Sequence, residues 1–293
     1  MPVKSRRRSR APVVSRTLRR RLLDMRGVVC DMDGTLVLGD RHNHGLLPLP
    51  GALDFIAWLR ERELPFVLFT NGTTRTPRQY ARMLRALGFA LTGANIMTPA
   101  SSAVDVFLRR EHRRVLVLGG AGLKQPLREA GLEIAVRGDP APVDAVLVGW
   151  FREFTMEDLE AAVHAVWNGA RLYSCSQSLY FATAQGRALG TSRAITAMIR
   201  DLTGCRVSIV GKPSLDALNS AARRLGVARR SLAVIGDDPG LEVAMAHRGQ
   251  CLAIAVHTGI GDDTAFSKLP RNQRPHLTVP GIAELLRLCQ NLR

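Results

Sequence analysis

The chain has 293 residues, 46% of them apolar and 23% charged, so it is long enough for one large globular domain or two. It contains no run of eighteen or more apolar residues, which argues against a membrane span, and its basic start lacks the apolar segment of a secretory signal. The five cysteines are scattered and never spaced as CxxC, which indicates reduced thiols in a cytoplasmic protein rather than disulfides or a zinc site.

The net charge of +16 is concentrated at the N-terminus. Residues 1–26 contain ten Lys or Arg and one acid, so they carry +9 of that charge. We interpret residues 1–25 as a basic, disordered and solvated tail. Contact with nucleic acid or an anionic membrane surface is the alternative. No aromatic residue interleaves the basic ones, so base stacking has no support.

Short apolar strands alternate with amphipathic helices along the chain, the pattern of an α/β protein with a largely parallel sheet. Residues 155–158 resemble a capping box, and Gly88 is a natural helix terminator. In chain order we predict a strand at 27–31, a helix at 51–62, a strand at 65–72, a helix at 78–87, a strand at 113–120, a helix at 123–129, a strand at 144–150, a helix at 156–167, a strand at 171–176, a helix at 192–202, and strands at 207–213, 231–238 and 251–259 with helices between them.

Four of these strands end in residues that can carry chemistry, in the stretches CDMDGT, LFTNG, IVGKP and VIGDD. Ligands of an open parallel sheet gather at the carboxyl ends of its strands, so we expect the four ends to share one site. About 140 residues separate the second end from the third, and they contain their own strand and helix signals. That length is enough for an inserted domain.

Asp31 and Asp33 follow the first strand and lie one residue apart. They point the same way if the strand geometry continues, and Gly34 allows a sharp turn after them. Paired acids can hold a divalent cation, or one can serve as a nucleophile while the other handles protons. An ordinary Asx turn is the alternative for the pair.

The other three strand ends supply groups suited to a phosphate and a metal ion. Thr70 and Asn71 offer a hydroxyl and an amide donor, and Lys212 offers a compact positive charge. The acids of the last strand end would complete an oxygen-rich site for magnesium; they are Asp237, Asp238 and, one helical turn on, Glu242. A surface lysine and an ordinary GDDPG turn are the alternatives, but four such coincidences on four strand ends are hard to credit to turns.

In their order, DxDGT, TN, GKP and GDD resemble the motifs of the haloacid dehalogenase (HAD) superfamily of phosphohydrolases. Four longer stretches resemble its NagD-like, p-nitrophenyl phosphatase branch (subfamily IIA): LPLPGALDFIAWLRERELPFVLFTNGTTRTP, VLVLGGAGLKQPLREAGLE, DAVLVGWFREFTMEDLEAAVHAVWNGARLY and GKPSLDALNSAARRLGV. The resemblance covers roughly residues 26–262. It implies a Rossmann-like core with a parallel sheet, at 26–97 and 186–293, and an inserted C2-type α/β cap at 98–185.

The resemblance also implies roles for the motif residues. Asp31 would be the nucleophile that forms an aspartyl-phosphate, and Asp33 the general acid that protonates the leaving oxygen and then activates water. The phosphoryl group would be held by Thr70, Asn71, Gly72 and Lys212. Magnesium (Mg²⁺) would be bound by Asp31, the backbone carbonyl of Asp33, and Asp237.

The chain departs from the family pattern at two positions. The family's second aspartate in the last motif is Glu242 here, which can bind magnesium through water, and Asp238 is the candidate stand-in. The cap often carries ATNxD near the active site, whereas this chain has YSCSQS, so Gln177 takes the place of the acidic cap residue. Because cap residues commonly select the leaving group in this family, the substrate cannot be carried over from the resemblance.

These observations predict a cytoplasmic, Mg²⁺-dependent phosphomonoesterase that acts on a small phosphorylated metabolite. Sugar phosphates, nucleoside monophosphates and phosphoglycolate-like acids all fit. A HAD phosphomutase is the alternative within enzymology, and the large cap favours hydrolysis over it. A catalytically weak protein that reaches nucleic acid through the basic tail is the alternative outside it, and the intact motifs argue against this one. We also consider a homodimer formed through the cap.

Overall fold

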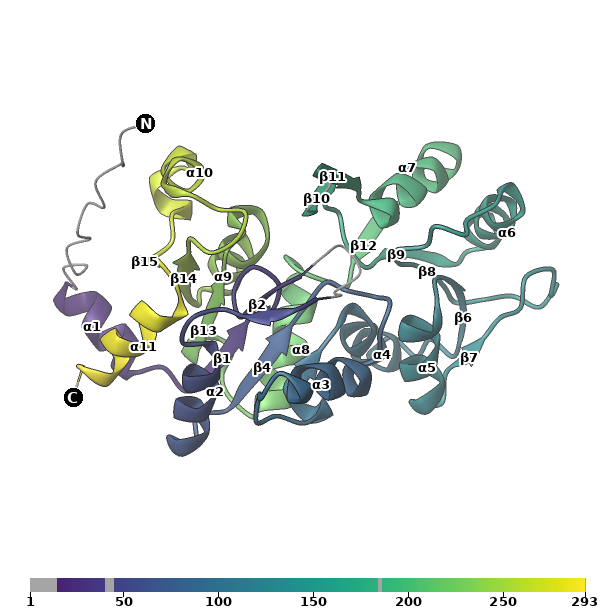
Figure 1. Cartoon of the computed structure of the whole chain (residues 1–293). Helices are drawn as coiled ribbons and strands as arrows, with labels where there is room; N and C mark the ends of the chain where they lie inside the picture. Colours follow the sequence, from purple (N-terminus) through teal and green to yellow (C-terminus); the bar gives the residue numbers. More distant parts are fainter. Residues whose placement is uncertain (1–14, 40–44, 184–185, 293) are drawn as a thin grey trace.

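Two parallel sheets, each covered by helices on both faces, form the frame of the chain (Figure 1). They are seen in a computed structural model that describes residues 15–39, 45–183 and 186–292. The fold is α/β, as the alternation of strands and helices predicts. None of the helices within these residues is long and apolar enough to cross a membrane.

The first sheet, called here the core sheet, has six parallel strands. From edge to edge they are β15 (Leu277–Val279), β14 (Leu252–Val256), β13 (Leu232–Gly236), β1 (Gly27–Cys30), β4 (Phe66–Phe69) and β5 (Ile96–Met97). In the centre, Cys30 of β1 lies opposite Ile235 of β13 and Leu68 of β4. Every residue of β1 is buried, because helices cover both faces, and this explains the unbroken apolar run before Asp31.

Apolar side chains alternate along β1 between two helical layers. Val28 and Cys30 pack on one side, and Val29 packs on the other. The first layer is made by α1 (Arg16–Leu23), α2 (Ala52–Glu61), α3 (Pro77–Ala86) and α11 (Ile282–Gln290). The second is made by α8 (Leu215–Leu225), α9 (Ala244–Gly249) and α10 (Asp263–Lys268).

The second sheet, called here the cap sheet, has five parallel strands. In spatial order they are β12 (Val207–Ile209), β9 (Arg171–Ser174), β8 (Ala145–Val148), β6 (Arg114–Leu118) and β7 (Glu133–Ile134). One face is covered by α4 (Pro99–Arg109) and α5 (Ala121–Glu129), and the other by α6 (Met156–Trp167) and α7 (Thr191–Thr203). The segment between the second and third motifs therefore forms a sheet of its own between two layers of helices.

Short antiparallel hairpins and single turns complete the fold. One hairpin, of β2 (Val37–Leu38) and β3 (Leu47–Pro48), follows the Asp33 segment, and the other, of β10 (Tyr180–Thr183) and β11 (Gly186–Leu189), follows β9. The turns are the 3₁₀ segments η1 (Gly93–Asn95), η2 (Arg229–Ser231) and η4 (Arg271–Gln273) and the π-helical turn η3 (Pro239–Val243).

The predicted end of the cap at residue 185 is too early. Helix α7 buries Ile195 and Ile199 in the apolar cluster of the cap sheet, and β12 pairs with β9. The cap therefore extends to β12, and the chain returns to the core only with α8. The first limit is close to the prediction, because β5 ends the core segment at Met97.

The interpretation of residues 1–25 as a disordered tail is wrong for its last part. Helix α1 begins after Ser15, whose hydroxyl accepts a hydrogen bond from the Leu18 amide, and it buries Leu22 against the core sheet. Arg21 also donates to the carbonyl oxygen of Cys251 at 3.0 Å. The buried leucine and this bond anchor the basic helix. Residues 1–14, including the stretch KSRRRSR, lie outside the described residues.

Candidate active site

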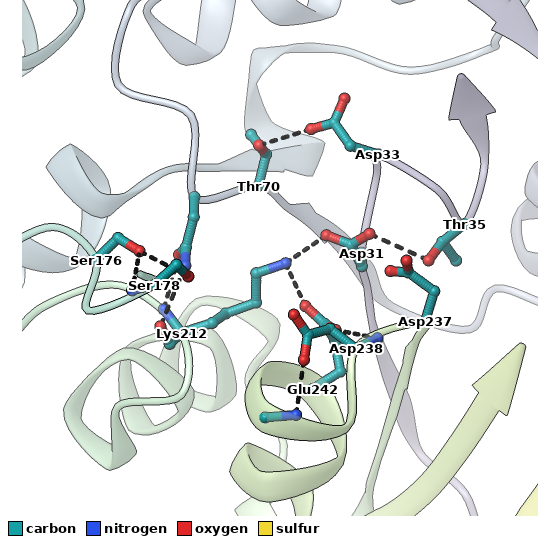
Figure 2. A network of polar contacts seen from close by, with 12 residues as sticks. Asp31, Asp33, Thr35, Thr70, Ser176, Ser178, Lys212, Asp237, Asp238 and Glu242 are labelled. Atoms are coloured by element: carbon teal, nitrogen blue, oxygen red, sulfur yellow. Dashed lines mark hydrogen bonds and ion pairs between the residues drawn. The ribbon is translucent and has the colours of Figure 1, made fainter. Parts of the chain in front are cut away.

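Three of the four predicted strand ends meet at one edge of the core sheet. Strands β13, β1 and β4 are direct neighbours, and they lead into Asp237, Asp31 and Thr70 respectively. The fourth end differs from the prediction, because β12 belongs to the cap sheet. Lys212, which follows β12, nevertheless reaches the same place (Figure 2).

Asp31 is buried and held at both carboxylate oxygens. Its Oδ1 accepts from the Lys212 ammonium, and its Oδ2 accepts from the Thr35 hydroxyl at 3.1 Å. Its backbone N–H donates to the carbonyl of Ile235 in the neighbouring strand at 2.8 Å. The carboxylate is thus fixed in one orientation at the end of β1.

Lys212 is the buried cation of the site, only 2% exposed. Its Nζ contacts Asp31 and lies 2.5 Å from Oε1 of Glu242. Burial disfavours the charged form, but the attraction of Asp31 and Glu242 outweighs it and raises the pKa of Lys212 above its usual value. The lysine is therefore a cation held by two carboxylates, and its burial excludes the alternative of a surface lysine.

Asp33 lies at the same edge but has a different partner. The Thr70 hydroxyl donates to Oδ2 of Asp33 at 3.1 Å and accepts from the backbone N–H of Gly72 at 2.9 Å. Asp33 is an exposed residue, yet enough protein surrounds its carboxyl group that lost hydration, followed by repulsion from Asp31, raises its pKa to about 7. A carboxyl group with this pKa can both give and take a proton near neutral pH.

Asp237 is buried beside Asp31 (Figure 2). Its Oδ2 accepts from the backbone N–H of Ile260 at 2.6 Å, and burial and repulsion from Asp31 raise its pKa to about 7. The loop that follows β14 approaches so closely that a Cβ on Gly259 would lie 1.9 Å from this oxygen. This fifth strand end was not among the four predicted, because HTG (257–259) was counted in the strand at 251–259, whereas β14 ends at Val256.

Asp238 and Glu242 have partners within the protein. Oδ1 of Asp238 accepts from the Gly240 amide at 2.7 Å and so caps the π-helical turn. The two oxygens of Glu242 accept from Lys212 and from the backbone N–H of Asp238, the latter at 3.1 Å. Burial raises the pKa of Glu242 although the attraction of Lys212 opposes this. Glu242 therefore lies in the site as the second counterion of the lysine.

Asn71 and Gln177 also bond to protein groups. The Asn71 side chain bonds to the backbone of Lys212, with Nδ2 donating to the carbonyl at 3.1 Å and Oδ1 accepting from the N–H at 2.8 Å. Gln177, in the loop after β9, donates to the Thr196 hydroxyl on α7 at 3.1 Å. Contacts of these two residues with a substrate stay predictions.

The donor set of the site fits Mg²⁺. Asp31 and Asp237 offer two buried carboxylates, and no third Asp, Glu, His or Cys within the described residues joins such a group in a metal-binding arrangement. Magnesium is usually held by one or two carboxylates together with water and substrate phosphate, not by an all-protein cage. Two acidic oxygen ligands at the end of a parallel sheet meet that requirement.

Two family models match the chain. The model described as haloacid dehalogenase-like hydrolase matches residues 28–133, and the model described as HAD-hydrolase-like matches residues 209–285. The first match contains Asp31 and Thr70, and the second contains Lys212 and Asp237. The two segments that supply the site are therefore the two that the models cover.

Full-length relatives agree with these matches. The acid sugar phosphatase of Staphylococcus saprophyticus is 28% identical over 259 residues, covering 88% of this chain and 95% of that protein. The ribonucleotide monophosphatase NagD of Escherichia coli K12 is 26% identical over 264 residues, covering 90% and 99%. A solved glycerol phosphate phosphatase from Mycobacterium tuberculosis, in complex with magnesium, has a TM-score of 0.79 at 25% identity, covering 90% of this chain and 77% of that one. The chain therefore belongs to the haloacid dehalogenase-like hydrolases, in their NagD-like branch.

Proposed function

We propose that the protein is a Mg²⁺-dependent phosphomonoesterase of small organic phosphates that works through an aspartyl-phosphate on Asp31. The observation that carries this proposal is the meeting of two differently held carboxyl groups at one sheet edge. Asp31 is fixed by Lys212 and Thr35, whereas Asp33 contacts Thr70 and is exposed. One group is held as a nucleophile would need to be, and the other is accessible for proton transfer.

In the first step, a carboxylate oxygen of Asp31 attacks phosphorus and the bond to the ester oxygen breaks. Asp33, whose pKa near 7 allows it to be protonated, gives its proton to the leaving oxygen. An alcohol leaves, and the phosphoryl group is bound to Asp31 as an acyl phosphate.

In the second step, water attacks the same phosphorus while Asp33, now ionised, takes the water proton. The bond between phosphorus and the Asp31 oxygen breaks, so the carboxylate is restored and phosphate leaves. The sum of both steps is one ester and one water converted to one alcohol and one phosphate.

Charge neutralisation comes from the residues around Asp31, because phosphoryl transfer depends mainly on positioning and electrostatics. The Lys212 ammonium and the Thr70 hydroxyl would hold phosphoryl oxygens. Asp31, the backbone carbonyl of Asp33, and Asp237 would hold Mg²⁺. When bound, the ion would neutralise the charge that develops on the transferred group.

The substrate class is a small phosphate monoester. The relatives are named for sugar phosphates, ribonucleotides and glycerol phosphate, so their names agree on small phosphate esters and differ in the leaving group. Gln177 stands where the family often has an acidic cap residue, and we propose that it takes part in leaving-group selection.

Turnover of p-nitrophenyl phosphate by wild type and by Asp31→Asn, with and without Mg²⁺, tests the proposal. We expect Mg²⁺-dependent release of p-nitrophenol and phosphate by wild type and no turnover by a folded Asp31→Asn protein. Equal rates in the two proteins would remove Asp31 as the nucleophile. If a sugar phosphate offered to the wild-type protein is isomerised without release of phosphate, the mutase alternative is correct instead.

Cytoplasmic location and a homodimer through the cap remain parts of this proposal. The first is supported by the cysteines, all five of which lie in the described residues and form no disulfide. Sedimentation of the wild-type protein would decide the second.

A further inference from the structure

The side chain of Asn71 holds the peptide groups on both sides of Lys212. Its Oδ1 accepts from the Lys212 N–H at 2.8 Å, and its Nδ2 donates to the Lys212 carbonyl at 3.1 Å. The two residues are 141 positions apart, one after core strand β4 and the other after cap strand β12. These two hydrogen bonds join the core to the cap at the point where the catalytic lysine enters the site.

The neighbouring backbone is fitted closely around this pair of bonds. A Cβ on Gly211 would lie 2.6 Å from Oδ1 of Asn71 and 2.0 Å from the carbonyl oxygen of Cys175. Only glycine lets the chain pass between these oxygens without displacing one of them. The position of the Lys212 backbone is thus defined by Asn71 on one side and by the end of β9 on the other.

This geometry bears on whether the Asn71 side chain binds phosphate directly. Its oxygen cannot donate to an anion and already accepts from Lys212. One N–H of its amino group donates to the Lys212 carbonyl, and the second N–H is a further donor. The two bonds to the Lys212 backbone orient the lysine whether or not the second N–H also meets a substrate.

We propose that Asn71 is a positioning residue, which sets the place of the Lys212 ammonium relative to Asp31. The inference rests on the proposed phosphatase function and assigns Asn71 a role within that same site. The Lys212 side chain spans from a backbone fixed by Asn71 to Asp31 and Glu242. A displacement of about 1 Å in a catalytic group can cost about 100-fold in rate, so release of the backbone lowers turnover strongly.

The hydrogen bond itself can be measured without any turnover. The chain has only four lysines, so selective ¹⁵N-lysine labelling gives at most four backbone amide signals. We expect the Lys212 amide to be protected from exchange in wild type and to exchange at least about tenfold faster in Asn71→Ala. Asn219→Ala is the matched control, because Asn219 lies on α8 and accepts a hydrogen bond from Arg229 in η2. Unchanged exchange in Asn71→Ala would overturn the proposal.

A double-mutant cycle with p-nitrophenyl phosphate tests the catalytic consequence. We expect Asn71→Ala to lower kcat about 100-fold and to change KM less than about threefold. In a Lys212→Met background, we expect the same substitution to lower kcat by less than about threefold. An equal loss in both backgrounds, or a raised KM at unchanged kcat, would overturn the positioning role. A protected Lys212 amide in a wild-type protein that hydrolyses no ester would refute the proposed function and leave the Asn71 contact standing.

Discussion

Replacing Lys212 by methionine is the sharpest perturbation of the site. The change keeps an unbranched apolar stem but removes the ammonium that contacts Asp31 and lies 2.5 Å from Glu242. Both carboxylates are buried, at 6% and 1% exposure. In Lys212→Met, the buried carboxyl groups of Asp31 and Glu242 therefore lose the ammonium group that both of them contact.

The expected loss of stability follows from that geometry. Removing one partner of a buried ion pair typically costs about 3–5 kcal/mol, because the other charge is left uncompensated. The loss also depends on pH. The attraction of Lys212 lowers the pKa of Glu242, so the variant raises that pKa further above its unfolded value. A group whose folded pKa is raised contributes stability at low pH that is lost as the pH rises, so the penalty is larger at pH 8 than at pH 6.

Urea unfolding of metal-free protein, followed by circular dichroism at the two pH values, measures this penalty. At about 3 kcal/mol per molar urea, the expected loss lowers the midpoint by about 1 M or more at pH 8. Lys268→Met is the matched control, because Lys268 is exposed and its replacement should change stability by less than about 0.5 kcal/mol. A Lys212→Met protein as stable as this control at pH 8, or one penalised more at pH 6, would refute the reasoning.

Three further outcomes are expected. Asp33→Asn should fold but lower kcat about 10²- to 10⁴-fold, measured as p-nitrophenol release, because it cannot exchange a proton with the leaving oxygen. Gly259→Ala places a Cβ 1.9 Å from the Asp237 carboxylate, so calorimetry should show weaker Mg²⁺ binding. Unchanged affinity would mean that the loop after β14 shifts to make room for the methyl group. His276 accepts from the Ala253 amide at 2.9 Å, and partial burial, followed by repulsion from Arg21, lowers its pKa to about 4. Stability should therefore fall as the pH drops from 6.5 toward 4. Because His276 is an exposed residue, solvent screens the effect, and His276→Asn should flatten this dependence by no more than about 1 kcal/mol.

Elements with strong local signals could be predicted from the sequence. The apolar run at 27–31 became β1, and the capping box at 155–158 begins α6, with the Thr155 hydroxyl accepting from the Asp158 amide as expected. The signals for buried strands and capped helices lie in consecutive residues, so a short window of sequence contains them. The grouping of the strand ends at β1, β4 and β13 followed from the rule that ligands gather at the carboxyl ends of parallel strands.

The placement of Lys212 could not be predicted in this way. Strand β12 has only three residues, and nothing in its apolar pattern tells whether it joins the core sheet or pairs with β9. Likewise, the GDD motif marks Glu242 as an oxygen donor but does not state its partner, and the partner is a lysine 30 residues away. The bonds of Asn71 cross 141 residues. These facts depend on tertiary packing, which no local window contains.

The position of Lys212 limits how the two sheets can move. The chain crosses between core and cap after β5 and again after β12, and the second crossing passes through Lys212. There the backbone is bound to Asn71 and the side chain to Asp31, both from core strand ends. The second crossing is therefore tied to core strand ends twice, through its backbone and through a buried ion pair. Removing one partner of a buried ion pair typically costs about 3–5 kcal/mol, so this attachment is the stronger of the two.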